Sequence, residues 1–265
     1  METFGATVTQ ACRLAGLSRT AWYRHSRAKD QTALRMRIRE IARDRPRYGA
    51  TRIGVLLRRE GWRVNKKRVH RLYCLEGLQV RMRVKRRKHM ALHRGPAPVP
   101  TGRGQRWSMD FVHDALIDGR AFRVLTVVDQ WSRESPLVEV QCGLSGRDVV
   151  RAFEARVPPA RLPKSITVDH GTEFTSKAVE AWAFYRGVTL DFTRPGKPTD
   201  NGHIESFNGR LRDECLNVHQ FLSIDHARAV IEAWRRDYNE QRPHSALGGL
   251  TPTAFAHHLQ APHPA

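Results

Sequence analysis

Cysteines, acidic residues and long apolar runs are all scarce in this sequence. Its 265 residues include 4 cysteines, Cys12, Cys74, Cys142 and Cys215, and no two of them form a C-x-x-C pair. That spacing argues against a zinc ribbon and against a disulfide framework. No stretch reaches the ~18 apolar residues that a membrane-spanning helix needs, and the first residues carry no apolar signal region. We therefore expect a cytoplasmic protein without membrane contact.

The shortage of acidic residues is confined to the front of the chain. Residues 1–100 carry 26 lysines and arginines against 6 acidic residues, a net charge of +20, whereas residues 101–265 carry 20 of each sign. A basic segment of this kind favours a polyanionic partner, above all nucleic acid. A solvated, arginine-rich surface without a partner is the alternative, because charge alone is an indirect indication.

The basic front half is patterned as helices. Between Thr9 and His25, a short helix is expected to end near Gly16 and a second one to be capped by Ser18, which is a helix-turn-helix pattern. A further helix is expected over residues 33–43, and Pro46 interrupts the helical pattern after it.

Two more helices complete a small bundle. Ile53, Leu56 and Leu57 have helical spacing, and Asn65 is placed to cap a helix whose apolar stripe is Val69, Leu72 and Tyr73. The basic residues beside that stripe are candidate contacts to DNA phosphates: Lys66, Lys67, Arg68 and Arg71.

A basic run and a proline-rich stretch end the helical region. Residues 81–94 contain Lys85, Arg86, Arg87 and Lys88, which would neutralise phosphates without reading base sequence. Because Pro and Gly break regular structure, we place a linker at residues 95–105. The predicted domains are thus a helix-turn-helix region over 1–94, a catalytic core over 106–222, and a C-terminal helix and tail over 223–265 packed on that core.

After the linker the pattern predicts an α/β domain. Three antiparallel strands are expected first, and then helices alternating with strands, which is typical of a layered α/β fold. The expected strands are 107–112, 122–128, 137–140, 165–168 and 188–192, and the expected helices are 146–155, 177–185, 201–216 and 223–238.

Three acidic residues stand in contexts that favour a catalytic site. Asp110 lies inside an apolar strand, where a carboxylate is costly unless it is a ligand or is paired. Asp169 ends the fourth expected strand, and Glu205 lies near a helix start. The 35 residues between the last two prove little, because Asp118 and Glu154 have the same separation. The alternative for each acid is a surface ion pair.

Converging carboxylates are the ligands that two-metal phosphodiester chemistry requires, and Mg²⁺ prefers carboxylate oxygens. On the helix of Glu205, Asn208 follows one turn later and Arg212 lies within about 20° of the same face at ~100° per residue. Arg212 is therefore placed to hold a DNA phosphate, and we also expect Asn208 to contact DNA.

Other acidic residues near these positions need separate interpretations. Asp129 would either structure a strand turn or support the site from behind, and Asp200 is interpreted as a helix cap. Asp114 and Glu173 lie close to the same regions without a context that recommends them.

The assembled motifs resemble those of DDE transposases and retroviral-type integrases. They are most similar to the larger (OrfB-type) product of bacterial two-frame insertion sequences. Residues 47–78 are similar to the helix-turn-helix region that precedes the core in that family. The matching core segments are Trp107–Asp110, Val128–Arg133, Val168–Phe174, Lys197–Asn208 and Tyr238–His244. No catalytic chemistry follows from the last of these, which is either a helix terminus packed on the core or a DNA contact.

The resemblance implies an RNase-H-like, integrase-core mixed sheet flanked by helices, preceded by a small all-helical helix-turn-helix region. It implies that Asp110, Asp169 and Glu205 are the catalytic metal ligands, with two Mg²⁺ (or Mn²⁺) ions per active site. The implied partners are double-stranded DNA of the terminal inverted repeats and of the target, with a homo-oligomer on DNA at the bacterial nucleoid.

The sequence departs from its relatives in two respects. It lacks the His-His-Cys-Cys zinc module of retroviral integrases. It also lacks the leucine-zipper segment of the upstream frame, so the upstream-frame product or a frameshifted fusion is a further expected partner.

We interpret the chain as a DDE transposase that cleaves and joins DNA at insertion-sequence ends. One alternative is a DNA-binding regulator or partner subunit that is inactive alone, and another is a hydrolytic RNase-H-like nuclease that never joins strands. Metal-dependent strand joining separates the first reading from both.

Overall fold

The computed structural model describes residues 7–24, 30–80, 99–194 and 201–258. The chain divides into two compact units, residues 1–37 and 38–265, and each is described by itself. In the described ranges no helix is long and apolar enough to cross a bilayer. Cys12, Cys74, Cys142 and Cys215 are all free thiols.

The first unit contains two short helices, α1 (Val8–Leu14) and α2 (Arg19–Trp22). The predicted cap of the second is confirmed, because the Ser18 hydroxyl accepts a hydrogen bond of 3.1 Å from the Ala21 amide. Gly16 follows α1 with a φ of +63°, a left-handed conformation that glycine adopts without steric cost. The helix-turn-helix pattern of residues 9–25 is thus present as two helices joined by a glycine turn.

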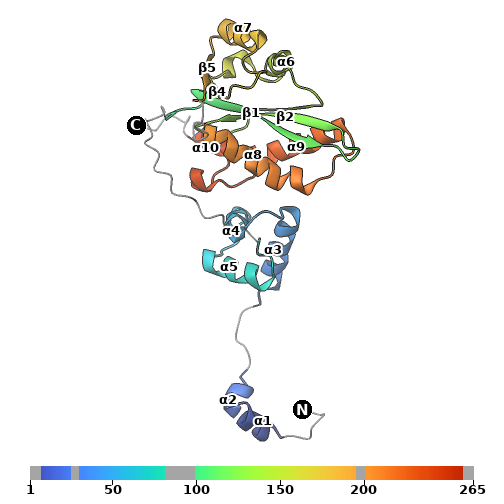
Figure 1. Ribbon diagram of the computed structural model, residues 1–265. Coiled ribbons are helices and arrows are strands. Elements are labelled where there is room, and N and C mark those ends of the chain that lie inside the picture. The colour runs from blue at the N-terminus through green and yellow to red at the C-terminus, as the bar shows by residue number, and fades with distance from the viewer. Residues whose placement is uncertain (1–6, 25–29, 81–98, 195–200, 259–265) are drawn as a thin grey trace, which may run out of the picture. The chain divides into compact units, whose positions relative to one another are not determined.

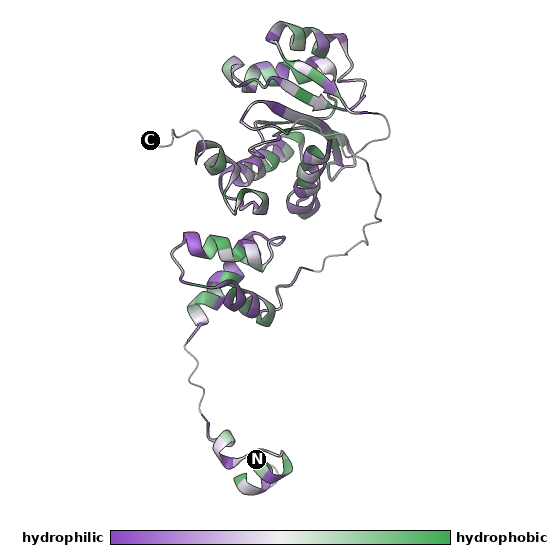
Figure 2. Ribbon diagram, turned by 90° about the vertical axis from the view of Figure 1, so that its left-hand side faces the viewer, coloured by the Kyte–Doolittle hydropathy of each residue, from purple (hydrophilic) through white to green (hydrophobic). Residues whose placement is uncertain are grey.

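Three further helices carry the predicted apolar stripes: α3 (Thr32–Asp44), α4 (Ala50–Arg59) and α5 (Lys66–Leu75). The Asn65 side chain caps α5 by accepting a 2.7 Å hydrogen bond from the Arg68 amide. Figure 2 shows hydrophobic and hydrophilic bands on each of the three helices. The expected stripe residues Ile53, Leu57, Val69, Leu72 and Tyr73 are buried, whereas Leu56 is only half-buried.

The remainder is an α/β fold around a five-stranded mixed sheet in the order β3-β2-β1-β4-β5 (Figure 1). β1, β2 and β3 pair antiparallel, and β4 and β5 run parallel to β1. The predicted mixed sheet with three antiparallel strands first is confirmed, and the structure adds the strand order. The strands are β1 (Arg106–Ala115), β2 (Ala121–Asp129), β3 (Leu137–Gln141), β4 (Ser165–Val168) and β5 (Thr189–Phe192).

Helices cover both faces of the sheet. The helices are α6 (Gly146–Arg156), α7 (Lys177–Arg186), α8 (Gly202–Glu214), α9 (Ile224–Glu240) and α10 (Pro252–His258), with 3₁₀ turns at Pro159–Arg161, Leu216–Val218 and Ser245–Leu247. Figure 1 shows α6 and α7 on one face and α8 and α9 on the other. Met109 of β1 belongs to the apolar cluster under α6 and α7, and Val112 belongs to the cluster under α8 and α9.

Helix ends account for the small differences from the expected elements. The helix expected over 201–216 begins at Gly202 and ends at Glu214, and a 3₁₀ turn follows it. Asn201 precedes α8 without a side-chain cap bond, and Asp200, the expected cap, lies outside the described residues. Residues 99–105 contain no helix or strand. The rest of the predicted linker lies outside the description, and the domain boundary there stays a prediction.

Candidate active site

The register of the sheet brings Asp110 and Asp169 side by side. β1 and β4 run parallel, with Ser108 opposite Thr167, and each aspartate is two residues further along its own chain. Continuing that register by one pleat sets the two aspartates on neighbouring strands, one within β1 and the other just past the end of β4. Carboxyl ends of parallel strands are where ligand-binding residues gather in α/β sheets.

Asp110 is held in a partly buried position. Its Oδ1 accepts a 2.7 Å hydrogen bond from the Phe111 amide, and its Oδ2 accepts a 2.9 Å bond from the side-chain amide of Asn208 on α8. The pKa of Asp110 is raised to about 6, first by burial and also by the nearby charges of Asp169 and Glu205, while the two hydrogen bonds oppose that rise. Both of the other carboxylates therefore lie within electrostatic range of Asp110.

Asn208 links the Asp110 side chain to the neighbouring strand β2. Thr126 on β2, which is fully buried, has its hydroxyl 2.8 Å from Asn208 Oδ1 and 3.0 Å from the Asp110 carbonyl. The amide of Asn208 thus has both of its ends engaged within the protein. The structure places this residue as a support for Asp110; a contact to DNA stays a prediction.

The loop after Asp169 is braced from the neighbouring strands. Asp169 Oδ1 accepts a 2.9 Å hydrogen bond from the Gly171 amide, and a Cβ added at Gly171 would lie 3.0 Å from that oxygen. Further along, the loop is fixed by an ion pair between Glu173 and Arg123 and by Phe174, whose ring stacks on Phe111 at 4.8 Å between centroids. The loop geometry that presents Asp169 therefore depends on a brace that the sequence did not reveal.

Glu205 and Arg212 share the exposed face of α8. Glu205 lies in the first turn, and Arg212 donates a 3.1 Å hydrogen bond to the carbonyl of His113 on β1. Ile204, Phe207 and Leu211 form the buried stripe of α8. In the parts of the chain that are described, no three His, Cys, Asp or Glu side chains are close enough to ligate one metal ion. The donor set nevertheless fits a hard cation, because it is made of oxygen ligands with mutually repelling charges.

A polar network behind the acids escaped sequence reasoning. Gln130 donates hydrogen bonds of 2.8 Å to the Ser108 hydroxyl and 3.1 Å to the Thr167 hydroxyl, and all three residues are buried. It ties β1 to β4 directly below the two aspartates. Polar residues at core positions of apolar strands were the signal that would have revealed it.

Asp129 structures a strand turn, one of its two expected roles. Its Oδ2 accepts hydrogen bonds from Gly104 and from the Trp107 indole, and its Oδ1 accepts bonds from the amides of Trp131 and Ser132. The carboxylate is 2% exposed and lies opposite Trp107 in the register. It orders the β2 exit.

The Tyr238–His244 motif is a helix terminus packed into the core. Asn239 makes two 2.9 Å hydrogen bonds to the Ser135 backbone, accepting from its amide and donating to its carbonyl. Arg242 donates two hydrogen bonds to Glu214, of 2.8 and 2.6 Å. Tyr238 packs edge-on against Phe207 of α8. The motif fixes α9 to α8, which favours the packing interpretation over a DNA contact.

His244 gives this terminus a pH dependence. Burial first, and then the charge of Arg242, lower the pKa of His244 to about 3. Below pH 6.5, His244 is protonated in the unfolded chain but stays neutral in the folded one. Stability therefore falls as the pH drops from 6.5 towards 3. Between pH 7 and 5.5 we expect the free energy of unfolding of His244→Gln to fall by about 1 kcal/mol less than that of the wild type. Urea unfolding at both pH values measures this difference. An equal loss in both proteins would contradict this assignment.

The predicted DNA-contact residues are not gathered at one place in the described structure. Lys66, Lys67 and Arg71 are exposed along α5 and Arg68 is half-buried, which leaves the basic face of this helix open to solvent. The expected contacts Lys85, Arg86, Arg87 and Lys88 lie outside the described residues.

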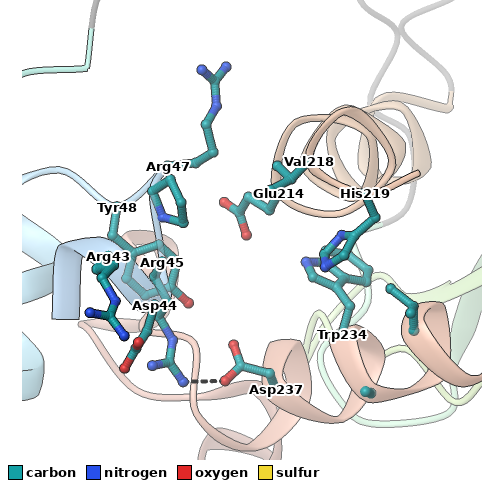
Figure 3. A pocket seen from close by; sticks show the side chains of 13 residues that line it. Arg43, Asp44, Arg45, Arg47, Tyr48, Glu214, Val218, His219, Trp234 and Asp237 are labelled. Atoms are coloured by element: carbon teal, nitrogen blue, oxygen red, sulfur yellow. Dashed lines mark hydrogen bonds and ion pairs between the residues drawn. The ribbon is translucent and has the colours of Figure 1, made fainter. Parts of the chain in front are cut away.

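A cavity of about 620 Å³ lies away from the three acids. Figure 3 shows Arg45 reaching Asp237 of α9 across it, with Trp234 and His219 on another wall. Two of its three acidic lining residues are paired, Asp237 with Arg45 and Glu214 with Arg242, and the third is Asp44.

Comparisons with known proteins agree with the architecture. Two family models described as "Integrase core domain" match residues 100–198 and 186–252, and one described as "HTH-like domain" matches residues 29–86. The chain is 47% identical to an uncharacterized 31.7 kDa protein of insertion element IS407 from Burkholderia multivorans, over 96% of this chain and 92% of the relative.

More distant matches extend the same pattern. The chain is 25% identical to the transposase InsF for insertion sequence IS3A of Escherichia coli, over 94% of this chain and 93% of the relative. Among solved structures, an intasome chain of simian T-cell lymphotropic virus shares 13% identity and a TM-score of 0.56, covering 86% of this chain and 77% of that one. At that identity the likeness concerns the fold alone.

Proposed function

Because the chain belongs to the OrfB-type transposases of bacterial insertion sequences, which carry an HTH-like domain and an integrase core, we propose that it cleaves DNA at the element ends and joins those ends to target DNA. Asp110, Asp169 and Glu205 are the catalytic residues in this proposal. The proposal is supported by the parallel register of β1 and β4, which sets Asp110 beside Asp169, and by Glu205 of α8, whose charge reaches Asp110.

The chemistry requires no nucleophile from the protein. In cleavage, a water oxygen bonds to phosphorus, the P–O3′ bond breaks, and the departing oxygen takes up a proton to become a 3′-hydroxyl. In joining, that hydroxyl oxygen bonds to a target phosphorus and another P–O3′ bond breaks. Two Mg²⁺ or Mn²⁺ ions held by these carboxylates would activate the attacking oxygen and stabilise the leaving one.

The chain's own residues position these groups. Phe111 and Asn208 fix both oxygens of Asp110 by hydrogen bonds, and the braced loop presents Asp169. Glu205, in the first turn of α8, gains mild support from the helix dipole. Asp110 is thus set by a strand, Glu205 by a helix and Asp169 by a braced loop, as a site that must hold reacting atoms in line requires.

DNA is the partner that an HTH-like domain and an integrase core imply. We propose that Lys66, Lys67, Arg68 and Arg71 contact phosphates of the terminal repeats and that Arg212 contacts one beside the acids. The basic run containing Lys85–Lys88 is proposed to follow the duplex. A homo-oligomer on DNA, with the upstream-frame product or a frameshifted fusion, would complete recognition of the ends.

The proposal is tested by strand transfer with labelled element-end DNA and a target plasmid, in Mg²⁺ and in EDTA. We expect joined product in Mg²⁺ and none in EDTA. Cleavage without joining would favour a hydrolytic nuclease. Salt-sensitive DNA binding without either reaction, both from this chain and from its fusion to the upstream-frame segment, would favour a regulatory DNA-binding protein.

Asn208→Ala is expected to lower the strand-transfer rate by about 10–100-fold, which is the usual cost of removing a residue that orients a metal ligand. The reason is that Asp110 Oδ2 loses its only side-chain donor. Gly209→Ala is the matched control, because a Cβ at this neighbouring helix position meets no atom within 4 Å. Single-turnover rates would measure both variants, and equal rates would contradict the positioning role.

A further inference from the structure

A cavity of about 220 Å³ lies along a different face of α8 from Glu205. Four α8 residues line it, Gly202, His203, Ser206 and Arg210. The three that carry side chains lie about 100–160° around the helix from Glu205 at ~100° per residue. The cavity is therefore separate from the acid site but belongs to the same helix.

The lining of this cavity is strongly cationic. Four arginines line it, Arg52, Arg133, Arg210 and Arg242, and among the residues that the structure describes no aspartate or glutamate does. Behind them, Glu214 is engaged by both hydrogen bonds of Arg242, and Arg52 lies 3.6 Å from it. In the described part of the chain neither Arg133 nor Arg210 has a carboxylate within the 4.0 Å of an ion pair. Half-buried cations without a counter-ion are costly unless an anion joins them.

Arg133 is held at the cavity by its surroundings. It occupies the β2 exit that Asp129 orders, with a φ of +65°, the only positive φ of a non-glycine residue in the described ranges. Its guanidinium meets a ring nitrogen of His203. Burial, and then Arg133, lower the pKa of His203 to about 4, so this imidazole is neutral at pH 7 and accepts from the guanidinium. The cation is fixed in place but not neutralised.

His244 adds an unsatisfied acceptor. Its Nδ1 lies 2.8 Å from the Arg242 carbonyl, which can only accept, so Nδ1 carries the proton and Nε2 is the bare acceptor. His244 is 5% exposed, and its Nε2 has no hydrogen-bond partner. Because this imidazole lines the cavity, a bound water beside the arginines could donate the missing hydrogen bond to Nε2.

We propose that this cavity binds a phosphate of the DNA backbone other than the scissile one, with Arg133 and Arg210 as its ligands. The planar fork of arginine matches phosphate oxygens in pairs, and one water would donate both to His244 Nε2 and to the phosphate. The inference rests on the proposed function, in which a DNA strand is engaged at Glu205. A helix is ~10–12 Å across, a distance that corresponds to about three nucleotides along one strand at 3.4 Å each. A strand engaged at Glu205 would therefore present a nearby phosphate to this second face of α8.

The test measures DNA binding in EDTA, by anisotropy of a labelled element-end duplex from 50 to 300 mM salt. Each phosphate contact contributes about 0.9 to the slope of log K against log salt, so Arg210→Gln is expected to lower that slope by about 0.9. Arg210→Lys is expected to recover most of it. Arg151→Gln, the same charge change at an exposed α6 position, is the control and is expected to keep the wild-type slope.

Two results would overturn the assignment. One is a wild-type slope in a folded Arg210→Gln protein; if that variant fails to fold, Arg133→Gln carries the same expectation. The other is thermal stabilisation of the wild type by inorganic phosphate, absent in Arg210→Gln, together with an unchanged DNA slope, because the cavity would then take free phosphate. Since no catalysis is measured, a reduced slope supports the phosphate site even where strand transfer is absent and the proposed function fails.

Discussion

Glu205→Gln and Asp110→Asn are each expected to reduce strand transfer by at least about 10³-fold while DNA binding persists. Each substitution keeps the size of the side chain but removes one negative charge from the group of acids. Stabilisation of the transition-state charge by bound metal contributes several kcal/mol, and ~4 kcal/mol corresponds to about 10³-fold in rate. Single-turnover strand transfer with pre-cleaved element ends measures the effect on joining alone.

The two variants make different demands on the fold, which sharpens the comparison. Glu205 is exposed, so Glu205→Gln should leave thermal stability within about 0.5 kcal/mol of the wild type. Asp110→Asn keeps one acceptor oxygen in place of two, so only one of the hydrogen bonds from Phe111 and Asn208 can be retained. Asp118→Asn, an exposed acid in the β1–β2 turn that pairs with Arg120, is the control. Wild-type joining by Glu205→Gln would remove Glu205 from the catalytic set.

Most of the sheet and of the acid site could be predicted because local pattern and global fold agree here. Asp110 is conspicuous as a charge inside an apolar strand, and Asp169 as an acid at a strand end. Both contexts follow from the cost of burying a carboxylate. Ser18 and Asn65 were correctly predicted as caps because their side-chain oxygens satisfy amides three residues away.

What could not be predicted depends on contacts between distant segments. Nothing in the local sequence pairs Arg123 with Glu173 or Asn208 with Asp110, because each contact depends on the register between strands and on how α8 lies across them. The Tyr238–His244 motif shows the same limit. Its residue types suit DNA contact and core packing equally well, and only burial distinguishes the two.

Arg242→Ala is expected to destabilise the protein by about 3–5 kcal/mol, the cost of leaving one partner of a buried ion pair alone. Arg242 is 2% exposed, and its side chain donates both of its hydrogen bonds to Glu214, whose side chain is 10% exposed. The loss also removes a cation lying 5.6 Å from the centre of the Tyr238 ring. At about 2–4 °C per kcal/mol for a protein of this size, the melting temperature should fall by roughly 10 °C.

The double variant Arg242→Met with Glu214→Leu separates a buried-charge effect from a packing effect. If the unpaired carboxylate is the cause, replacing both partners by apolar groups should recover most of the lost stability. Arg236→Ala, at an arginine that is 68% exposed in its pair with Glu232, should cost under about 1 kcal/mol. A cost for Arg242→Ala as small as that would mean that Arg52, 3.6 Å from Glu214, takes over the pairing. The junction of α8 and α9 would then rest on the packing of Tyr238 against Phe207.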